Sequence, residues 1–123
     1  VTIVSFGKII KEAYKAADIL AEEGIDCEVI DLRTIRPMDY NAILESVKKT
    51  NRLVILEESW PFGNIATEIT FQVQSQIFDC LDAPIEKINT ADTPAPYSPV
   101  LLAEWLPNAN DVIKSVKKVM YLS

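Results

Sequence analysis

Short β-branched runs alternate with amphipathic helical stripes along the whole chain, and this alternation restricts the possible folds more than any other feature. The apolar runs predict four strands, at residues 1–6, 27–32, 52–56 and 85–88. Each run is followed by a segment whose apolar residues recur at helical spacing. Strand–helix units with connections of this length predict parallel strands joined by right-handed crossovers, and therefore a three-layer α/β/α sandwich with a four-stranded sheet.

The helical stripes also indicate where each helix begins or ends. The first stripe ends at Gly24, and Asp39 precedes the second stripe at the position of an N-cap. Because Leu53 to Leu56 is apolar on both faces, this strand is expected to be covered by helices on each side. The residues expected to face the core from the four helices are Ile9, Ala13, Ala16, Leu20, Tyr40, Ile43, Leu44, Val47, Ile65, Ile69, Val73, Ile77, Val112, Val116, Val119 and Met120.

Five prolines follow the third helix, at positions 84, 94, 96, 99 and 107. Proline fixes φ and removes a backbone donor, so this region is predicted to be a rigid extended loop. The same region contains Asp79, Asp82 and Asp92. A rigid acidic loop suits the docking of a partner.

Size and charge narrow the class of protein. The 123 residues, 49% of them apolar, predict one domain over 1–123 with a substantial core. A net charge of −6 argues against nucleic acid as a partner and favours a basic protein. No apolar run approaches the roughly 18 residues of a membrane span. Because Val1 already begins a strand, we expect the chain to be a piece of a longer protein.

The residues give little support for catalysis. Ligands of parallel sheets usually bind at the carboxyl ends of the strands, where this chain has Arg33, Arg36 and several carboxylates. There is no histidine, and three glycines cannot form a phosphate-binding loop. Neither Cys27 nor Cys80 lies in a metal-spaced cluster, so both are expected to be reduced thiols. No catalytic, cofactor-binding or metal-binding residue is therefore predicted.

The remaining charged groups have structural interpretations. Glu57 and Glu58 are consecutive strand residues, so they are expected to point to opposite faces. Asp31 and Arg33 are expected to form an ion pair at a strand end, and Arg36 to tie its loop to a carboxylate. The pair Lys117-Lys118 is expected on the solvated face of the last helix.

Five separated motifs occur in an order that resembles a known family. They are Glu28 to Asp39, Ser46 to Thr50, Glu57-Glu58-Ser59-Trp60-Pro61, Leu81-Asp82-Ala83-Pro84, and Ala91-Asp92-Thr93-Pro94-Ala95-Pro96-Tyr97. Together they resemble the C-terminal transketolase-type domain of the beta subunit of the 2-oxoacid dehydrogenase decarboxylases. Asp82, with Ala91-Asp92 and Tyr97, is more similar to the pyruvate-specific members than to the branched-chain ones.

The resemblance implies a role for the chain within a larger enzyme. The full enzyme of this family uses thiamine diphosphate and magnesium to decarboxylate pyruvate and reductively acetylate a lipoyl group. The residues that hold and activate the cofactor lie on the alpha subunit and on the preceding beta domain. The domain itself is expected to be inactive, to shape the heterotetramer with the alpha subunit and a second beta subunit, and to dock the dihydrolipoyl acyltransferase.

The resemblance also implies which residues meet these partners. Asp82 is expected to meet an arginine of the acyltransferase's small basic subunit-binding domain, with Leu122 and Ser123 at the same place. Alternatively, Asp82 caps its own turn. Trp60 and Phe62 follow a strand end, and aromatic residues dominate interface cores, so these two are expected at a subunit interface. Local core packing is the alternative for them.

The family fold implies a sheet order of second, first, third, fourth strand. The second strand would then lie at an edge, where we expect self-association. Other interpretations stay open: a branched-chain or acetoin enzyme, or a stand-alone flavodoxin-like binding module. The expected compartment is the cytoplasm if the source is bacterial and the mitochondrial matrix if it is eukaryotic.

Overall fold

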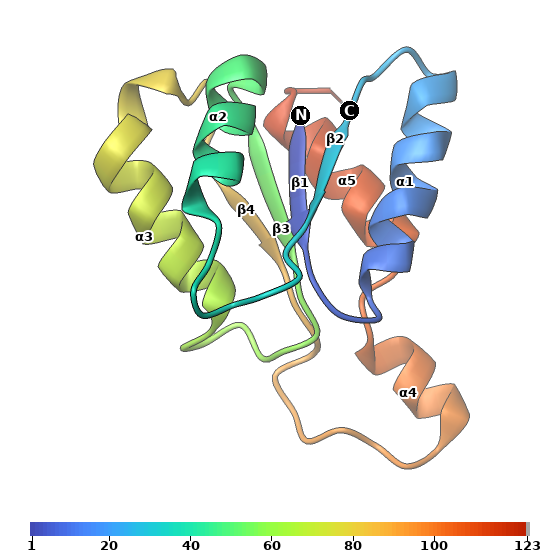
Figure 1. Cartoon of the computed structure of the whole chain (residues 1–123). Helices are drawn as coiled ribbons and strands as arrows, with labels where there is room; N and C mark the ends of the chain where they lie inside the picture. Colours follow the sequence, from blue (N-terminus) through green and yellow to red (C-terminus); the bar gives the residue numbers. More distant parts are fainter. Residues whose placement is uncertain (123) are drawn as a thin grey trace.

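Four parallel strands form one sheet in the order β2-β1-β3-β4, as the resemblance implied (Figure 1). The computed structural model describes residues 1–122. The elements follow one another as β1 (Thr2–Ser5), α1 (Ile10–Glu22), β2 (Glu28–Asp31), α2 (Tyr40–Thr50), β3 (Leu53–Leu56), α3 (Ile65–Ile77), the short 3-10 helix η1 (Phe78–Cys80), β4 (Glu86–Ile88), α4 (Pro99–Trp105) and α5 (Ala109–Val119).

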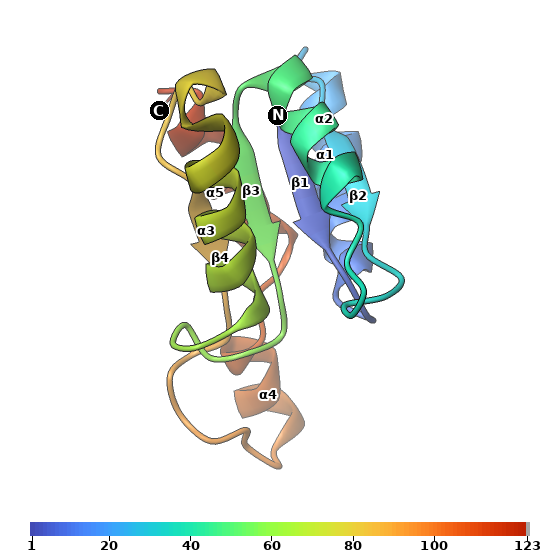
Figure 2. The same cartoon turned by 60° about the vertical axis from the view of Figure 1, so that its left-hand side comes forward.

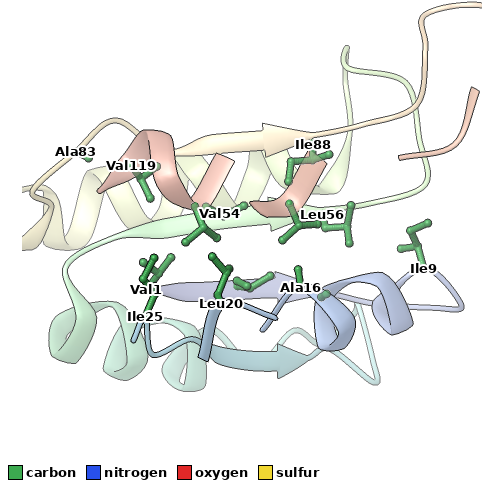
Figure 3. Close-up of a cluster of buried hydrophobic side chains, with 14 residues drawn as sticks. Val1, Ile9, Ala16, Leu20, Ile25, Val54, Leu56, Ala83, Ile88 and Val119 are labelled. Carbon is green, nitrogen blue, oxygen red and sulfur yellow. The ribbon is translucent and has the colours of Figure 1, made fainter. Parts of the chain in front are cut away.

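Helices cover both faces of the sheet and make the predicted three layers. Figure 1 shows α1 and α5 on one side and α2 and α3 on the other. The fully buried strand β3 separates two hydrophobic clusters. Val54 and Leu56 face the α1–α5 cluster, drawn in Figure 3, while Leu53 and Ile55 face the α2–α3 cluster. The alternation along one strand thus serves both sides, as expected for a central strand.

Local signals at the helix ends act as predicted. The Asp39 carboxylate accepts a hydrogen bond from the Ala42 backbone N–H at 3.1 Å, and this bond satisfies one of the first donors of α2. Gly24 has φ +80°, a conformation that lets the chain turn after α1. In addition to these predicted signals, helix α5 begins with a capping box between Asn108 and Asp111, which was not predicted.

The proline-rich segment differs from the prediction, because it is not extended throughout. Residues Pro99–Trp105 form helix α4, with Pro99 in the first turn. Proline is favoured there, since its missing N–H has no intrahelical acceptor and its fixed φ already suits a helix. Helix α4 contains no buried residue, and Figures 1 and 2 both show it beyond the carboxyl ends of the strands.

Strand β2 lies at the predicted edge of the sheet, where charged side chains are present. Glu28 pairs with Lys49 of α2, and the hydrogen bond from Lys49 lowers the pKa of Glu28. Charged side chains on an edge strand oppose edge-to-edge pairing. Self-association through β2 therefore stays a prediction, and the charged side chains of this strand act against it. Within residues 1–122, no helix has the length and apolar character needed to cross a membrane.

Candidate partner-binding surfaces

The parallel sheet places the predicted partner-binding residues at two opposite ends of the domain. Asp82 precedes β4 and therefore lies at the amino ends of the strands. Trp60 and Phe62 follow β3 and lie at the carboxyl ends, on the side of α4. We call these the Asp82 surface, formed around residues 78–85 and 121–122, and the Trp60 surface, formed around residues 59–65 and 97–105.

The backbone of Asp82 is held in place by Asn51. The Asp82 N–H donates to the Asn51 carbonyl oxygen at 2.8 Å, and the Asn51 side-chain amide donates to the Cys80 carbonyl oxygen at 2.8 Å. Asn51 has φ +67°, a left-handed conformation that asparagine tolerates better than most residues. One residue at the end of α2 thus anchors both sides of the turn that presents Asp82.

The Asp82 carboxylate faces solvent beside an arginine of the same chain. Its side chain is 55% exposed, and its Oδ2 lies 3.8 Å from Arg52 Nη1. Arg52 is itself fixed, because its Nε donates to the Val119 carbonyl oxygen at 2.8 Å. Within residues 1–122, the hydrogen bonds of Asp82 use its backbone and not its carboxylate. The sequence pattern predicts only that Arg52 begins the third strand, and it gives no sign that Arg52 lies beside Asp82.

An apolar groove of about 470 Å³ lies next to Asp82. Phe78 and Tyr121 line it and are 67% and 70% exposed, and the Tyr121 hydroxyl donates to the Asp82 carbonyl oxygen at 3.3 Å. The other lining residues are Thr70, Gln74, Leu81, Ala83, Pro84 and Ile85. A half-exposed carboxylate beside apolar walls can bind a partner that brings both a cation and an apolar side chain.

The end of α5 turns back toward this groove. The Leu122 N–H donates to the Lys117 carbonyl oxygen at 2.8 Å, and the Tyr121 N–H donates to that of Lys118 at 3.0 Å. These bonds form a Schellman motif, with Tyr121 at φ +58° in the position that glycine usually takes. Leu122 is 49% exposed and close to the predicted site. The predicted partner-binding residue Ser123 lies outside the described residues.

At the other end, aromatic and apolar side chains are exposed around the β3–α3 loop. Trp60 is 50% exposed and Phe62 is 89% exposed. Both line a groove of about 440 Å³ with Phe6, Glu57, Ser59, Gly63, Asn64 and Ile65. Tyr97, Val100 and Leu101, in and before α4, are also exposed. Such exposure does not fit the alternative that Trp60 and Phe62 pack in the core.

The buried side chain of Glu57 ties this end of the domain together. It is fully buried, and its two oxygens accept hydrogen bonds from the Ala66 N–H at 3.2 Å and the Asn89 side-chain amide at 2.9 Å. The neighbouring Glu58 is exposed, so the two carboxylates point apart as predicted. Glu57 joins the start of α3 to the end of β4, and its hydrogen-bond partners within residues 1–122 are a backbone N–H and an amide, not a second carboxylate for acid–base work.

Two of the predicted ion-pair arrangements are wrong. Within residues 1–122, neither Arg33 nor Arg36 forms a salt bridge, and both are exposed on the β2–α2 connection. The two lysines predicted on the solvated face of α5 both form ion pairs: Lys117 pairs with Glu23 of α1 at 3.1 Å, and Lys118 pairs with Glu86 of β4. The prediction of a solvated face is therefore confirmed for Lys118, whose side chain is 75% exposed, and is wrong for Lys117, whose side chain is only 29% exposed.

The thiols and carboxylates do not gather into a ligand set. Cys27 and Cys80 are free and half-buried, and burial raises the pKa of Cys27. Across the described part of the chain, no three His, Cys, Asp or Glu side chains come together as metal ligands do.

The sheet order and the helices on both faces define an α/β domain of the transketolase type. A solved structure of a split gene transketolase, an inactive beta4 tetramer, has the same fold, with a TM-score of 0.85 and 28% identity. The superposition covers 98% of this chain and 39% of that one. The family model "Transketolase, C-terminal domain" matches residues 1–112, and the chain belongs to this family.

Curated relatives with high identity are beta subunits of pyruvate dehydrogenase E1. The chain is 52% identical over 123 residues to the Rickettsia felis subunit and 52% identical over 120 residues to that of Rhizobium meliloti. It is 47% identical over 123 residues to a mitochondrial subunit of Arabidopsis thaliana. The alignments cover 98% to 100% of this chain but only 26% to 38% of these relatives. The chain thus spans about a third of their length.

Proposed function

We propose that the chain is the C-terminal domain of a pyruvate dehydrogenase E1 beta subunit and serves assembly and docking. The observation that carries this proposal is 52% identity across the whole chain to such a subunit. The enzyme of which the domain is part decarboxylates pyruvate and reductively acetylates lipoyl groups. The names of the relatives favour this substrate over the branched-chain and acetoin alternatives.

The two ends of the domain receive different partners. The Trp60 surface contacts the alpha subunit and the second beta subunit of a heterotetramer, since exposed aromatic side chains are typical of interface cores. The beta4 assembly of the transketolase relative supports a role in subunit contacts. The Asp82 surface binds the basic subunit-binding domain of the dihydrolipoyl acyltransferase. A net charge of −6 and the half-exposed Asp82 carboxylate support this assignment.

Thiamine diphosphate and magnesium belong to other parts of the full enzyme. The described residues do not fit these groups, because no acidic cluster of metal-ligand type is present and the glycines do not form a phosphate loop. The cofactor supplies the decarboxylation chemistry from outside this domain. The relatives include bacterial and mitochondrial proteins, so the compartment is the cytoplasm in a bacterium and the matrix in a eukaryote.

Titration of the isolated chain with thiamine diphosphate and magnesium is expected to give no binding heat. The physical reason is the missing combination of phosphate cradle and metal ligands. Isothermal calorimetry measures this directly. The beta subunit assembled with alpha is the positive control, and micromolar binding by the isolated chain would contradict the assignment.

Replacing Phe62 by Ala in the complete beta subunit is expected to weaken association with alpha at least tenfold. An 89% exposed ring contributes little to folding but much to an interface that buries it, so the melting temperature should stay within about 1 °C. Trp60→Ala should likewise reduce assembly before it unfolds the domain. Sedimentation velocity measures the association.

Phe71→Ala is the matched control for this test. Phe71 is a 59% exposed ring on the side of α3 opposite its buried residues, and it does not line the groove that Trp60 and Phe62 share. Its loss should leave association with alpha unchanged. Equal effects of Phe62→Ala and Phe71→Ala, or parallel losses of melting temperature and assembly, would reject the interface role.

A further inference from the structure

Two indole rings from different segments donate to one backbone oxygen. Trp60 Nε1 lies 2.8 Å from the Thr93 carbonyl oxygen, and Trp105 Nε1 lies 2.9 Å from the same oxygen. A carbonyl oxygen has two lone pairs and can accept both bonds. Trp60 belongs to the β3–α3 loop and Trp105 to the last turn of α4, so this oxygen joins three segments. We call the arrangement the Thr93 clasp.

Helix α4 needs such an attachment. It has seven residues and buries none of them, and a helix this short is not stable alone in water. The Ala91 N–H donates to the Trp105 carbonyl oxygen at 3.1 Å, closing residues 91–105 into a loop. Beyond that closure, the Thr93 clasp joins the helix to the loop that follows β3.

The β3–α3 loop, which carries Trp60, is itself fixed by hydrogen bonds to neighbouring segments. The Asn64 side-chain amide donates to the Trp60 carbonyl oxygen at 2.6 Å, and Lys87 Nζ of β4 donates to the Pro61 carbonyl oxygen at 2.9 Å. The Thr90 N–H donates to the Ser59 carbonyl oxygen at 2.9 Å. The Trp60 ring therefore extends from a backbone that three bonds hold in place.

We propose that Trp60 and Trp105 are positioning residues that hold α4 at a fixed place beside the β3–α3 loop through the Thr93 carbonyl. The clasp makes Phe62 of the loop and Val100 and Leu101 of α4 parts of one preorganised surface. Preorganisation lowers the entropy lost when a partner binds. The binding of a partner by this surface rests on the proposed assembly function, whereas the attachment of α4 by the Thr93 clasp does not.

Trp60→Phe in the complete, unassembled beta subunit tests the clasp. This variant keeps an aromatic ring at position 60 but removes the indole N–H that donates to the Thr93 carbonyl oxygen. Position 60 is 33 residues away from Thr93 in sequence, so an effect near Thr93 would report this contact. We expect backbone amides of residues 91–106 to exchange with deuterium about fivefold faster, the change expected for one net hydrogen bond. Trp105→Phe should give a similar increase, and the double variant a larger one. Phe62→Leu, in the same loop and without a donor, should change nothing in 91–106.

Unchanged exchange of residues 91–106 in Trp60→Phe would overturn the clasp, since Trp60 would then act only within its own loop. The same holds if Phe62→Leu has an equal effect. The assembly role fails separately. If Phe62→Ala leaves association with alpha intact while Trp60→Phe speeds exchange in α4, the clasp stands and the proposed interface does not.

Discussion

Asp82→Asn in the assembled decarboxylase is expected to weaken binding of the acyltransferase's subunit-binding domain by about 2–5 kcal/mol, while pyruvate decarboxylation with an artificial electron acceptor is unchanged. Calorimetric titration with the isolated subunit-binding domain at physiological salt measures the first quantity. If the proposed docking is correct, most of the loss is expected to come from an arginine of the partner that is buried without a counter-charge.

The geometry explains why this effect should be large. Asn51 fixes the backbone of Asp82, so little entropy is lost when the carboxylate is engaged. Asparagine keeps the shape and one acceptor oxygen but loses the charge. The ion pair with Arg52 does not cancel the prediction, because at 3.8 Å and with a 55% exposed carboxylate it contributes under about 1 kcal/mol.

Asp79→Asn is the matched control, since it removes the same charge from an exposed residue three positions earlier. It should change affinity by less than about 1 kcal/mol, as expected for a charge at the rim. If both variants lose affinity equally, the domain attracts its partner only through net charge. An unchanged affinity for Asp82→Asn would reject the docking role of this carboxylate.

Glu57→Ala is expected to lower the free energy of unfolding by about 2–5 kcal/mol. The substitution leaves the buried Ala66 N–H and the partly buried Asn89 side-chain amide without their acceptors, and each unsatisfied buried group costs about 1–3 kcal/mol. Urea denaturation measures the change. The loss should appear as a lower midpoint with an unchanged slope.

Two further variants test whether the lost hydrogen bonds cause the loss of stability. Glu57→Gln keeps one carbonyl acceptor and similar volume, so its loss should be smaller than that of Glu57→Ala. Glu58→Ala removes the neighbouring exposed carboxylate and should change stability by less than about 0.5 kcal/mol. A loss for Glu57→Ala below that of Glu58→Ala would show that the two hydrogen bonds contribute nothing.

The fold could be predicted from the sequence because its signals are local and repeated. Strand runs, helical stripes, the Asp39 cap and the turn at Gly24 each depend on neighbouring residues. The strand order came from the family resemblance, since periodicity alone does not order strands. Helix α4 was not predicted, because the five closely spaced prolines indicate an extended loop, whereas Pro99 occupies a position in the first turn that favours a helix.

The candidate surfaces were less predictable, because they depend on contacts between distant residues. Arg52 meets Asp82 across 30 positions, and Trp105 meets Trp60 through a third residue, Thr93. The sequence separates Glu57 from Glu58 but does not reveal its partners, which are the Ala66 backbone N–H and the Asn89 side-chain amide. Such contacts arise where segments converge at the ends of the sheet, and no local pattern records them.

Hydroxyl-radical footprinting of the exposed aromatic side chains tests the two-ended account most directly. Assembly of the beta subunit with alpha should slow oxidation of Phe62 and Tyr97, while Phe78 and Tyr121 stay reactive. Saturation with the acyltransferase's subunit-binding domain should then slow oxidation of Phe78 and Tyr121 at the Asp82 surface. Unchanged oxidation of Phe78 and Tyr121 in the saturated complex, or of Phe62 and Tyr97 after assembly with alpha, would contradict the account.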